Sequence, residues 1–121
     1  MDANSVRENE LTYAIRLSAM EIEQLEAISE NLEGLCTIKH GSRKTVSGMR
    51  LLSIGLNSDT DVDFLANVLN AALAEFASVK LDHFVSVVSE EDTFLVDLPE
   101  RACRMIGLCP GRVVFSATTG V

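Results

Sequence analysis

A strand followed directly by a helix is predicted by residues 11–34, LTYAIRLSAMEIEQLEAISENLEG. Apolar residues alternate over 11–17, and this period of two is typical of a half-buried strand. Ser18 and Glu21 have the spacing of a capping box, in which each side chain binds a free backbone N–H of the other residue. Apolar residues then recur at helical spacing until Gly34, which is typical of a helix stop. We therefore expect a strand and then a helix that begins near Ser18.

The same pattern continues outward along the chain. Strand patterns occupy 35–40, 49–56 and 79–89, and a second helical pattern lies between the last two. The residues that could cap this second helix are Ser58, Asp59 and Thr60. Its apolar stripe consists of Val62, Leu65, Leu69, Leu73 and Phe76. The order β-α-β-β-α-β predicts a ferredoxin-like sheet with two helices on one face.

A further β-α-β segment is predicted after this unit. It comprises a strand at 93–98, a short helix from Pro99 to Gly107, and a strand at 112–117 that extends the sheet. A chain of 121 residues suits one domain. The boundaries that follow are a loose N-terminus, 1–9, and a single α+β domain, 10–121.

Composition and charge disfavour several classes of protein. Ten Lys and Arg residues against 18 Asp and Glu residues give a net charge of −8, which disfavours nucleic-acid binding. No apolar run is long enough to span a membrane, and MDANSVRENE (1–10) lacks the apolar stretch of a signal peptide. Cys36, Cys103 and Cys109 form no C-x-x-C pair. We expect a cytoplasmic protein with reduced thiols, no cofactor and no membrane contact.

One basic cluster stands out in this acidic chain. It comprises Lys39, His40, Arg43, Lys44 and Arg50. The glycine spacing does not match a phosphate loop, and the next element has a strand pattern. The cluster is either a contact for an anion or an acidic partner, or an ordinary solvated loop.

No pattern identifies a metal site or a catalytic residue. Asp59, Asp61 and Asp63 begin like a calcium loop, but Phe64 and Asn70 occupy the positions that would need Gly and Glu. These aspartates also suit a helix N-terminus. A nucleophile–base pair of Cys36 with His40 stays open, because catalytic partners meet in space rather than in sequence.

Both faces of the central strands are expected to be largely apolar. The fourth strand places His83, Val85 and Val87 on one face and Phe84, Ser86 and Val88 on the other, and adjacent Leu51 and Leu52 point to opposite faces. One helix layer covers only one face. We therefore expect a homodimer formed through the other face. The alternative cover is the short helix of segment 93–117.

Two stretches, TYAIRLSAMEIEQLEAI (12–28) and FLVDLPERACRMIGLCPGRVVFSA (94–117), resemble small bacterial families of unknown function in element order and apolar pattern. Some of these families are suspected toxin-immunity proteins, and others travel in mobile gene cassettes. The resemblance transfers no functional residue to this chain.

Two functions remain open from the sequence. The first is a non-catalytic binding protein, of the acidic immunity or antitoxin type, that meets a basic protein partner. Its partner-facing helix would carry Glu21, Glu23, Glu26 and Glu30. The alternative is a small-molecule binding domain or a modest enzyme, with a site between sheet and helices or at a dimer interface.

Overall fold

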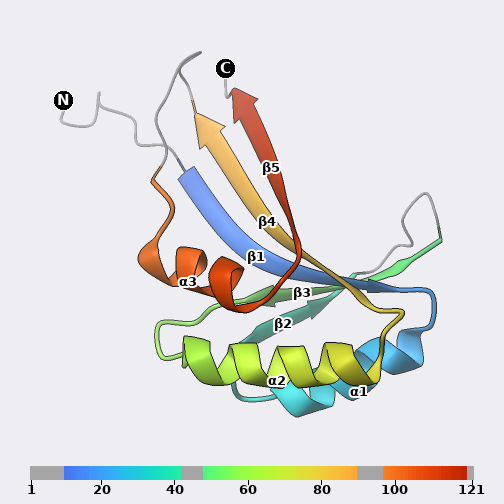
Figure 1. Ribbon diagram of the computed structural model, residues 1–121. Helices are drawn as coiled ribbons and strands as arrows, with labels where there is room; N and C mark the ends of the chain where they lie inside the picture. The colour runs from blue at the N-terminus through green and yellow to red at the C-terminus, as the bar shows by residue number, and fades with distance from the viewer. Residues whose placement is uncertain (1–9, 42–47, 90–96, 120–121) are drawn as a thin grey trace, which may run out of the picture.

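The computed structural model describes residues 10–41, 48–89 and 97–119, and in them three helices accompany one sheet (Figure 1). The expected α+β class is confirmed. In chain order the elements are β1 (Glu10–Ala19), α1 (Ile22–Leu32), β2 (Thr37–His40), β3 (Arg50–Gly55), α2 (Val62–Glu75), β4 (Lys80–Ser89), α3 (Glu100–Leu108) and β5 (Arg112–Thr119).

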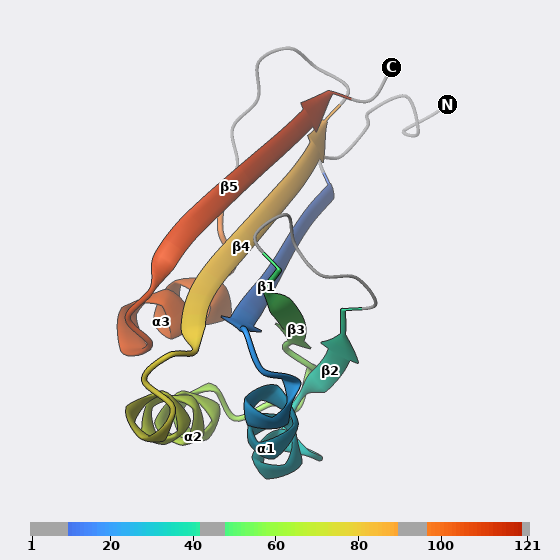
Figure 2. The same ribbon diagram turned by 90° about the vertical axis from the view of Figure 1, so that its right-hand side faces the viewer.

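The five strands form one mixed sheet in the order β2-β3-β1-β4-β5 (Figure 2). β1 lies at the centre and is antiparallel to both β3 and β4, while β2 is antiparallel to β3. β5 is parallel to β4, and α3 lies in the crossover that such a parallel pair requires.

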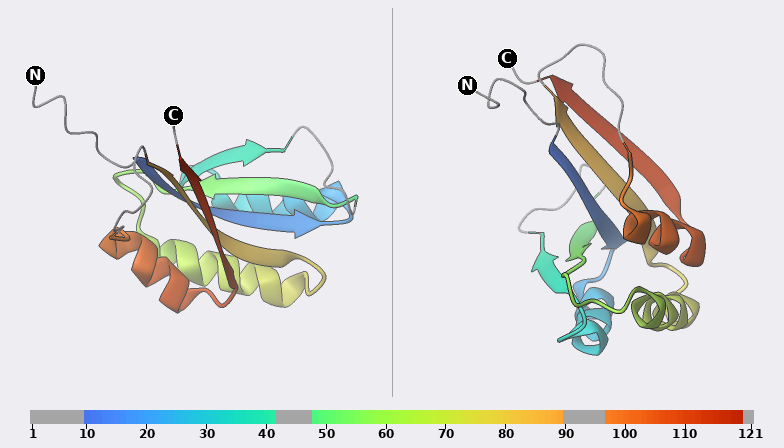
Figure 3. Two further views of the ribbon diagram at one scale, coloured as in Figure 1. Left: turned by 90° about the horizontal axis from the view of Figure 1, so that it is seen from above. Right: turned by 90° about the vertical axis from the view of Figure 1, so that its left-hand side faces the viewer.

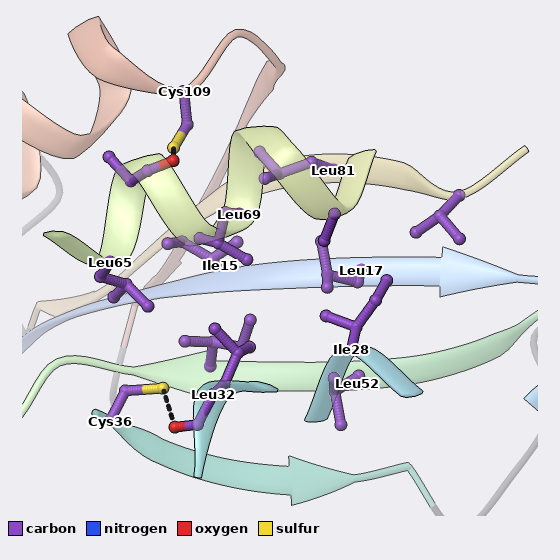
Figure 4. Packing of buried hydrophobic residues seen from close by; sticks show 14 of the residues in the cluster. Ile15, Leu17, Ile28, Leu32, Cys36, Leu52, Leu65, Leu69, Leu81 and Cys109 are labelled. Atoms are coloured by element: carbon purple, nitrogen blue, oxygen red, sulfur yellow. Dashed lines mark hydrogen bonds between the residues drawn. The ribbon is translucent and has the colours of Figure 1, made fainter. Parts of the chain in front are cut away.

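The core forms on the side of the sheet that carries the helices. The register places Ile15 of β1 opposite Ile54 and His83, and Leu17 opposite Leu52 and Leu81. These side chains pack against buried leucines and isoleucines of α1 and α2 (Figure 4). The apolar residues that alternate over 11–17 therefore lie on the core side of β1, as expected.

The predicted capping box at the start of α1 is wrong. β1 continues to Ala19, and Ser18 is paired in the ladder with Leu51 and Lys80. α1 begins at Ile22, and its N-cap residue, Glu21, makes no side-chain capping bond. The ladder on both sides of β1 thus keeps Ser18 extended, and this outweighs the local capping signal.

The cap of α2 lies one residue after the expected positions. The Asp61 carboxylate accepts a hydrogen bond from the Phe64 N–H at 3.1 Å. The Thr60 hydroxyl instead accepts from the Asn57 N–H at 2.8 Å and holds the preceding turn. The apolar stripe of this helix is confirmed at its centre, where Leu65 and Leu69 are fully buried.

The C-terminal segment differs in part from its prediction. Most of the expected strand at 93–98 lies outside the described residues, and its last two positions, 97 and 98, are not strand. α3 runs one residue beyond the expected end at Gly107, and Pro99 is its N-cap rather than its first residue. At Gly111 the chain passes so close to β4 that an added Cβ would lie 2.6 Å from the Leu81 carbonyl oxygen.

α3 packs on the same side of the sheet as α1 and α2. Met105 and Cys109 belong to the core cluster, and α3 lies next to α2 (Figure 3). The alternative in which the short helix covers the other face is therefore wrong. Val85 and Val87 are fully buried on the helix side.

Candidate functional site

On the sheet face opposite the helices, strands from distant parts of the described chain lie side by side. We call this face the open face. Its side chains are partly or fully exposed, and the face alternates apolar residues with serines and threonines, so the expectation of a largely apolar face is wrong. Its apolar members are Ala14, Leu51, Phe84, Val88 and Val114, and its hydroxyl-bearing members include Thr12, Ser18, Ser53, Ser86 and Ser116.

A stacked pair lies near the middle of the open face. The Arg16 guanidinium carbon of β1 lies 3.8 Å from the centroid of the Phe84 ring of β4. Stacking holds a guanidinium flat on the ring and leaves its N–H edge able to bind a planar anion such as a carboxylate. Arg16 and Phe84 are diagonal neighbours on adjacent strands. In the register Phe84 lies opposite Ala14, two residues before Arg16, and Arg16 lies opposite Asp82.

Charge on the open face has the opposite sign to that of the whole chain. Asp82 is acidic and pairs with Arg112 at 3.1 Å, and Glu10 at the start of β1 falls on the same face by its register with Val88. The cationic side chains are Arg16, Lys39, Lys80 and Arg112. A locally cationic surface on a chain of net charge −8 favours an acidic ligand at that place.

Hollows mark the same face. One of about 200 Å³ is lined by Arg16, Lys39, His40, Gly41, Leu51 and Ser53. A neighbouring one of about 230 Å³ shares Lys39 and Ser53 with it. A third hollow, of about 470 Å³, lies where β1 ends and β4 and β5 begin, and Lys80 and Arg112 line it. Each of these three hollows is thus lined by at least one cationic side chain of the open face.

The predicted basic cluster is only partly within the described chain. Lys39 and His40 are both exposed and line one hollow, while Arg43 and Lys44 lie outside the described residues. Arg50 pairs with buried Ala19, on the other side of the sheet from Leu51. The alternation over 11–17 puts Arg16 on the face opposite the core, but Phe84 lies 68 positions away along the chain, so no local pattern pointed to their contact.

The acidic residues of α1 lie on the helix side of the molecule, away from the open face. No residue of α1 is basic, and its glutamates are exposed. These are Glu21 at the N-cap, then Glu23, Glu26 and Glu30. The described charges are thus separated, with the cations concentrated on the sheet and the carboxylates on the helices.

A buried polar pair links the sheet to α3. The His83 ring is fully buried, and its Nε2–H donates to the Cys109 carbonyl oxygen at 2.7 Å. Nδ1 lies 2.7 Å from the Tyr13 hydroxyl, and in the tautomer that carries its proton on Nε2 it accepts a hydrogen bond from that hydroxyl. Burial, with the nearby Cys109 as a lesser cause, raises the pKa of the Tyr13 phenol, so the phenol keeps its proton. This arrangement ties β1, β4 and the end of α3 together.

The space beside this pair is small. A hollow of about 180 Å³ is lined by Tyr13, Leu56, Pro99, Arg101 and Ala102. Ligand pockets usually measure about 300–1,000 Å³. The Arg101 guanidinium is engaged with the Thr60 carbonyl oxygen at 2.6 Å. The geometry therefore favours a structural role for Tyr13 and His83.

Two of the three free cysteines are buried. The Cys36 thiol points to the Leu32 carbonyl and the Cys109 thiol to the Ala66 carbonyl (Figure 4). Burial raises the pKa of both thiols, that of Cys109 to about 11, so both are protonated and unreactive at neutral pH. A protonated Cys36 bound to Leu32 does not favour its pairing with exposed His40 as a nucleophile and base.

The aspartates that begin like a calcium loop have structural partners. Asp61 caps α2, and Asp63 binds the Arg104 guanidinium through both carboxylate oxygens at 2.6 and 2.8 Å. In the described part of the chain, no group of three or more His, Cys, Asp or Glu side chains is placed to hold a metal ion.

Comparisons with known proteins identify no relative of this chain, so the candidate site is described from its geometry alone. Within residues 10–41, 48–89 and 97–119, no helix combines the length and apolar character needed to cross a bilayer. No model of a known protein family and no curated protein matches the chain.

Proposed function

We propose that this chain is a non-catalytic protein-binding module whose recognition surface is the open face of its sheet. The observation that carries the proposal is the Arg16–Phe84 stack, set among partly exposed apolar and hydroxyl side chains and flanked by Lys39. Arginine and aromatic residues are enriched among the residues that dominate binding energy at protein interfaces.

The partner of this face is an acidic polypeptide segment with apolar side chains. A carboxylate meets the N–H edge of Arg16 or the ammonium of Lys39, and each such charge-assisted hydrogen bond is stronger than a neutral one. The apolar side chains of the segment lie against Phe84 and Leu51, which are half-buried. The hydroxyl of Ser53 lies in the hollow between the two cations.

We further infer that β1 to β4, with α1 and α2, form a ferredoxin-like unit to which β5 is added. The pairings of β1 with β3 and β4, and of β2 with β3, support this inference, because all three are antiparallel as that fold requires. In such a unit the two helices cover one face of the sheet and leave the other face uncovered.

An immunity-like role in the cytoplasm is compatible with this proposal. The exposed glutamates of α1 would in that case meet a basic partner, as the sequence suggested. The three free cysteines support a reducing compartment. The two surfaces differ in the sign of charge, so their partners can be distinguished by experiment.

Chemical-shift mapping on the isotope-labelled protein tests the proposal. The probes are two short peptides, one of alternating glutamate and leucine and a matched one of alternating lysine and leucine. The account predicts that the acidic peptide shifts the amides around Arg16, Ser53 and Phe84. Shifts confined to α1 with the basic peptide would contradict the open face as the recognition surface and favour the acidic helix.

A small-molecule site has one observation in its favour. The hollow of about 470 Å³ brings Lys80 and Arg112 together around Asp82, and its size is that of an ordinary ligand site. The titration of inorganic phosphate tests it. Saturable shifts at Lys80 and Arg112 would support this second function, and none at millimolar phosphate would exclude an anion site there.

A further inference from the structure

β5 forms one edge of the sheet, and no strand in the described part of the chain pairs with its outer side. The strand has eight residues and spans about 26 Å. It rises away from α1 and α2 with the upper parts of β1 and β4 (Figures 1 and 2). Alternate residues of such an edge point their backbone N–H and C=O groups away from the sheet, which makes the edge a template for another strand.

The side chains of β5 do not protect this edge. The strand reads RVVFSATT and has no charged residue after Arg112 and no proline. Phe115 is 56% exposed and Val113 is 47% exposed, and both lie on the helix side, beside Val85 and His83 in the register. β-Branched and aromatic residues also favour the strand conformation.

The opposite edge of the sheet has the usual protection. β2 has only four residues, and two of them are the exposed Lys39 and His40. Short edge strands and lysine side chains are devices that prevent pairing between edges. Within the described residues, the β2 edge therefore carries features that oppose pairing with a second strand, and the β5 edge does not.

We propose that β5 pairs antiparallel with β5 of a second copy of this chain, so that two sheets join into one across a two-fold axis near Phe115. In this register Phe115 faces the partner's Phe115, and Val113 faces the partner's Ala117. Opposed residues on one face pack across the joint, and aromatic pairs add to the stability of such contacts.

Electrostatics permit this contact in spite of the net charge of −8. The only charge on β5 is Arg112, which its own Asp82 neutralises. Antiparallel pairing places the two arginines at opposite ends of the joint. A dimer through the open faces, in contrast, would oppose Arg16 and Lys39 to the same cations of the second copy. The edge holds no acidic residue that would repel a second copy of this acidic chain, and its exposed Val113 and Phe115 meet apolar side chains across the two-fold axis, so a second copy fits it.

This geometry has a consequence for binding. A two-fold axis perpendicular to the sheet keeps both open faces on the same side, so the dimer presents two recognition surfaces next to each other. Strand pairing alone buries less area than the roughly 1,600 Å² of a standard interface. The dimer should therefore dissociate on dilution.

Sedimentation equilibrium over micromolar to millimolar concentrations tests the proposal. The wild-type mass should rise from 13.1 kDa towards twice that value as concentration increases. Phe115→Lys should give only the monomer mass at every concentration. Phe64→Lys is the matched control, because Phe64 on α2 is 51% exposed and lies away from the edge, and it should dimerise like the wild type.

Hydrogen exchange on the unmodified protein provides a measurement that needs no variant. Amides of residues 112–119 should exchange faster on dilution, whereas those of β1 should not change. A monomer at all concentrations, a dimer that survives Phe115→Lys, or a dimer without concentration-dependent protection in β5 would each overturn the proposal.

Discussion

His83 has a structural role that its place in the sequence does not indicate. Neither the residue type nor its position beside Asp82 indicates that the ring lies fully buried between Tyr13 and the Cys109 carbonyl. Both partners are distant along the chain, so only the tertiary fold brings them together. A buried polar ring with both nitrogens satisfied helps to specify the packing of α3 on the sheet.

Removal of this ring should destabilise the protein strongly. His83→Leu leaves the Tyr13 hydroxyl and the Cys109 carbonyl without their partner, and we expect a loss of about 2–5 kcal/mol of unfolding free energy. Tyr13→Phe leaves only Nδ1 unsatisfied and should cost less, about 1–3 kcal/mol. Urea denaturation measures both. Equal stability of His83→Leu and wild type would show that the ring does not hold α3.

The three thiols should differ in reactivity. Cys103 is exposed on α3, whereas Cys36 and Cys109 are buried and their thiol pKa values are raised. We expect a thiol-specific alkylating reagent at neutral pH to modify Cys103 alone, and the other two only after unfolding. Mass spectrometry of the digested protein locates the label. Rapid labelling of Cys109 in the folded state would contradict its burial.

At the scale of elements, periodicity predicted the fold better than local caps did. The apolar stripe of α2 and the alternating apolar residues of β1 were both predicted, and both contain the residues that are buried in the core. Their burial depends on packing across the whole sheet rather than on a single contact. The Ser18 capping box was not formed, because ladder partners on both sides extend β1 to Ala19. Helix ends depend on single hydrogen bonds, which nonlocal contacts outweigh.

The caps provide a matched pair of substitutions. Asp61→Ala removes the acceptor of the Phe64 N–H and should cost about 0.5–2 kcal/mol. Ser18→Ala removes no capping bond of α1 and should cost clearly less. Chemical denaturation of the two variants gives the comparison. A larger loss of unfolding free energy for Ser18→Ala would show that Ser18 caps α1 after all.

The contact between α2 and α3 should depend on pH. A hydrogen bond from Arg104, supported by its charge, lowers the pKa of the Asp63 carboxyl below its unfolded value. The stabilisation is therefore present above the unfolded pKa and is lost as the pH falls through the lower, folded pKa. A double-mutant cycle of Asp63→Asn and Arg104→Ser should show coupling at pH 7 that disappears in acid. Coupling that persists in acid would contradict the ion pair as its source.

At the scale of the whole molecule, the open face is a product of topology. Its cations come from four different strands, β1, β2, β4 and β5, and the order of the strands was needed to place them on one surface. The sequence indicated Lys39 and His40 through the local basic cluster and placed Arg16 on this face through the alternation of the first strand, but it did not indicate Lys80 or Arg112. The net charge of −8 also gave no indication of a cationic face, because it sums over the whole chain and most of the described carboxylates lie outside the sheet.

The central claim is that this face, through Arg16, binds an acidic partner. Its most direct test is the affinity of a fluorescent peptide of alternating glutamate and leucine for Arg16→Ser and for Arg104→Ser, measured by anisotropy. The two variants lose the same charge, but Arg104 lies on α3, away from the open face. We expect Arg16→Ser to weaken binding about 10- to 100-fold, as the loss of a charged hydrogen bond implies, and Arg104→Ser to leave it unchanged. Equal affinities of the two variants would contradict the central claim.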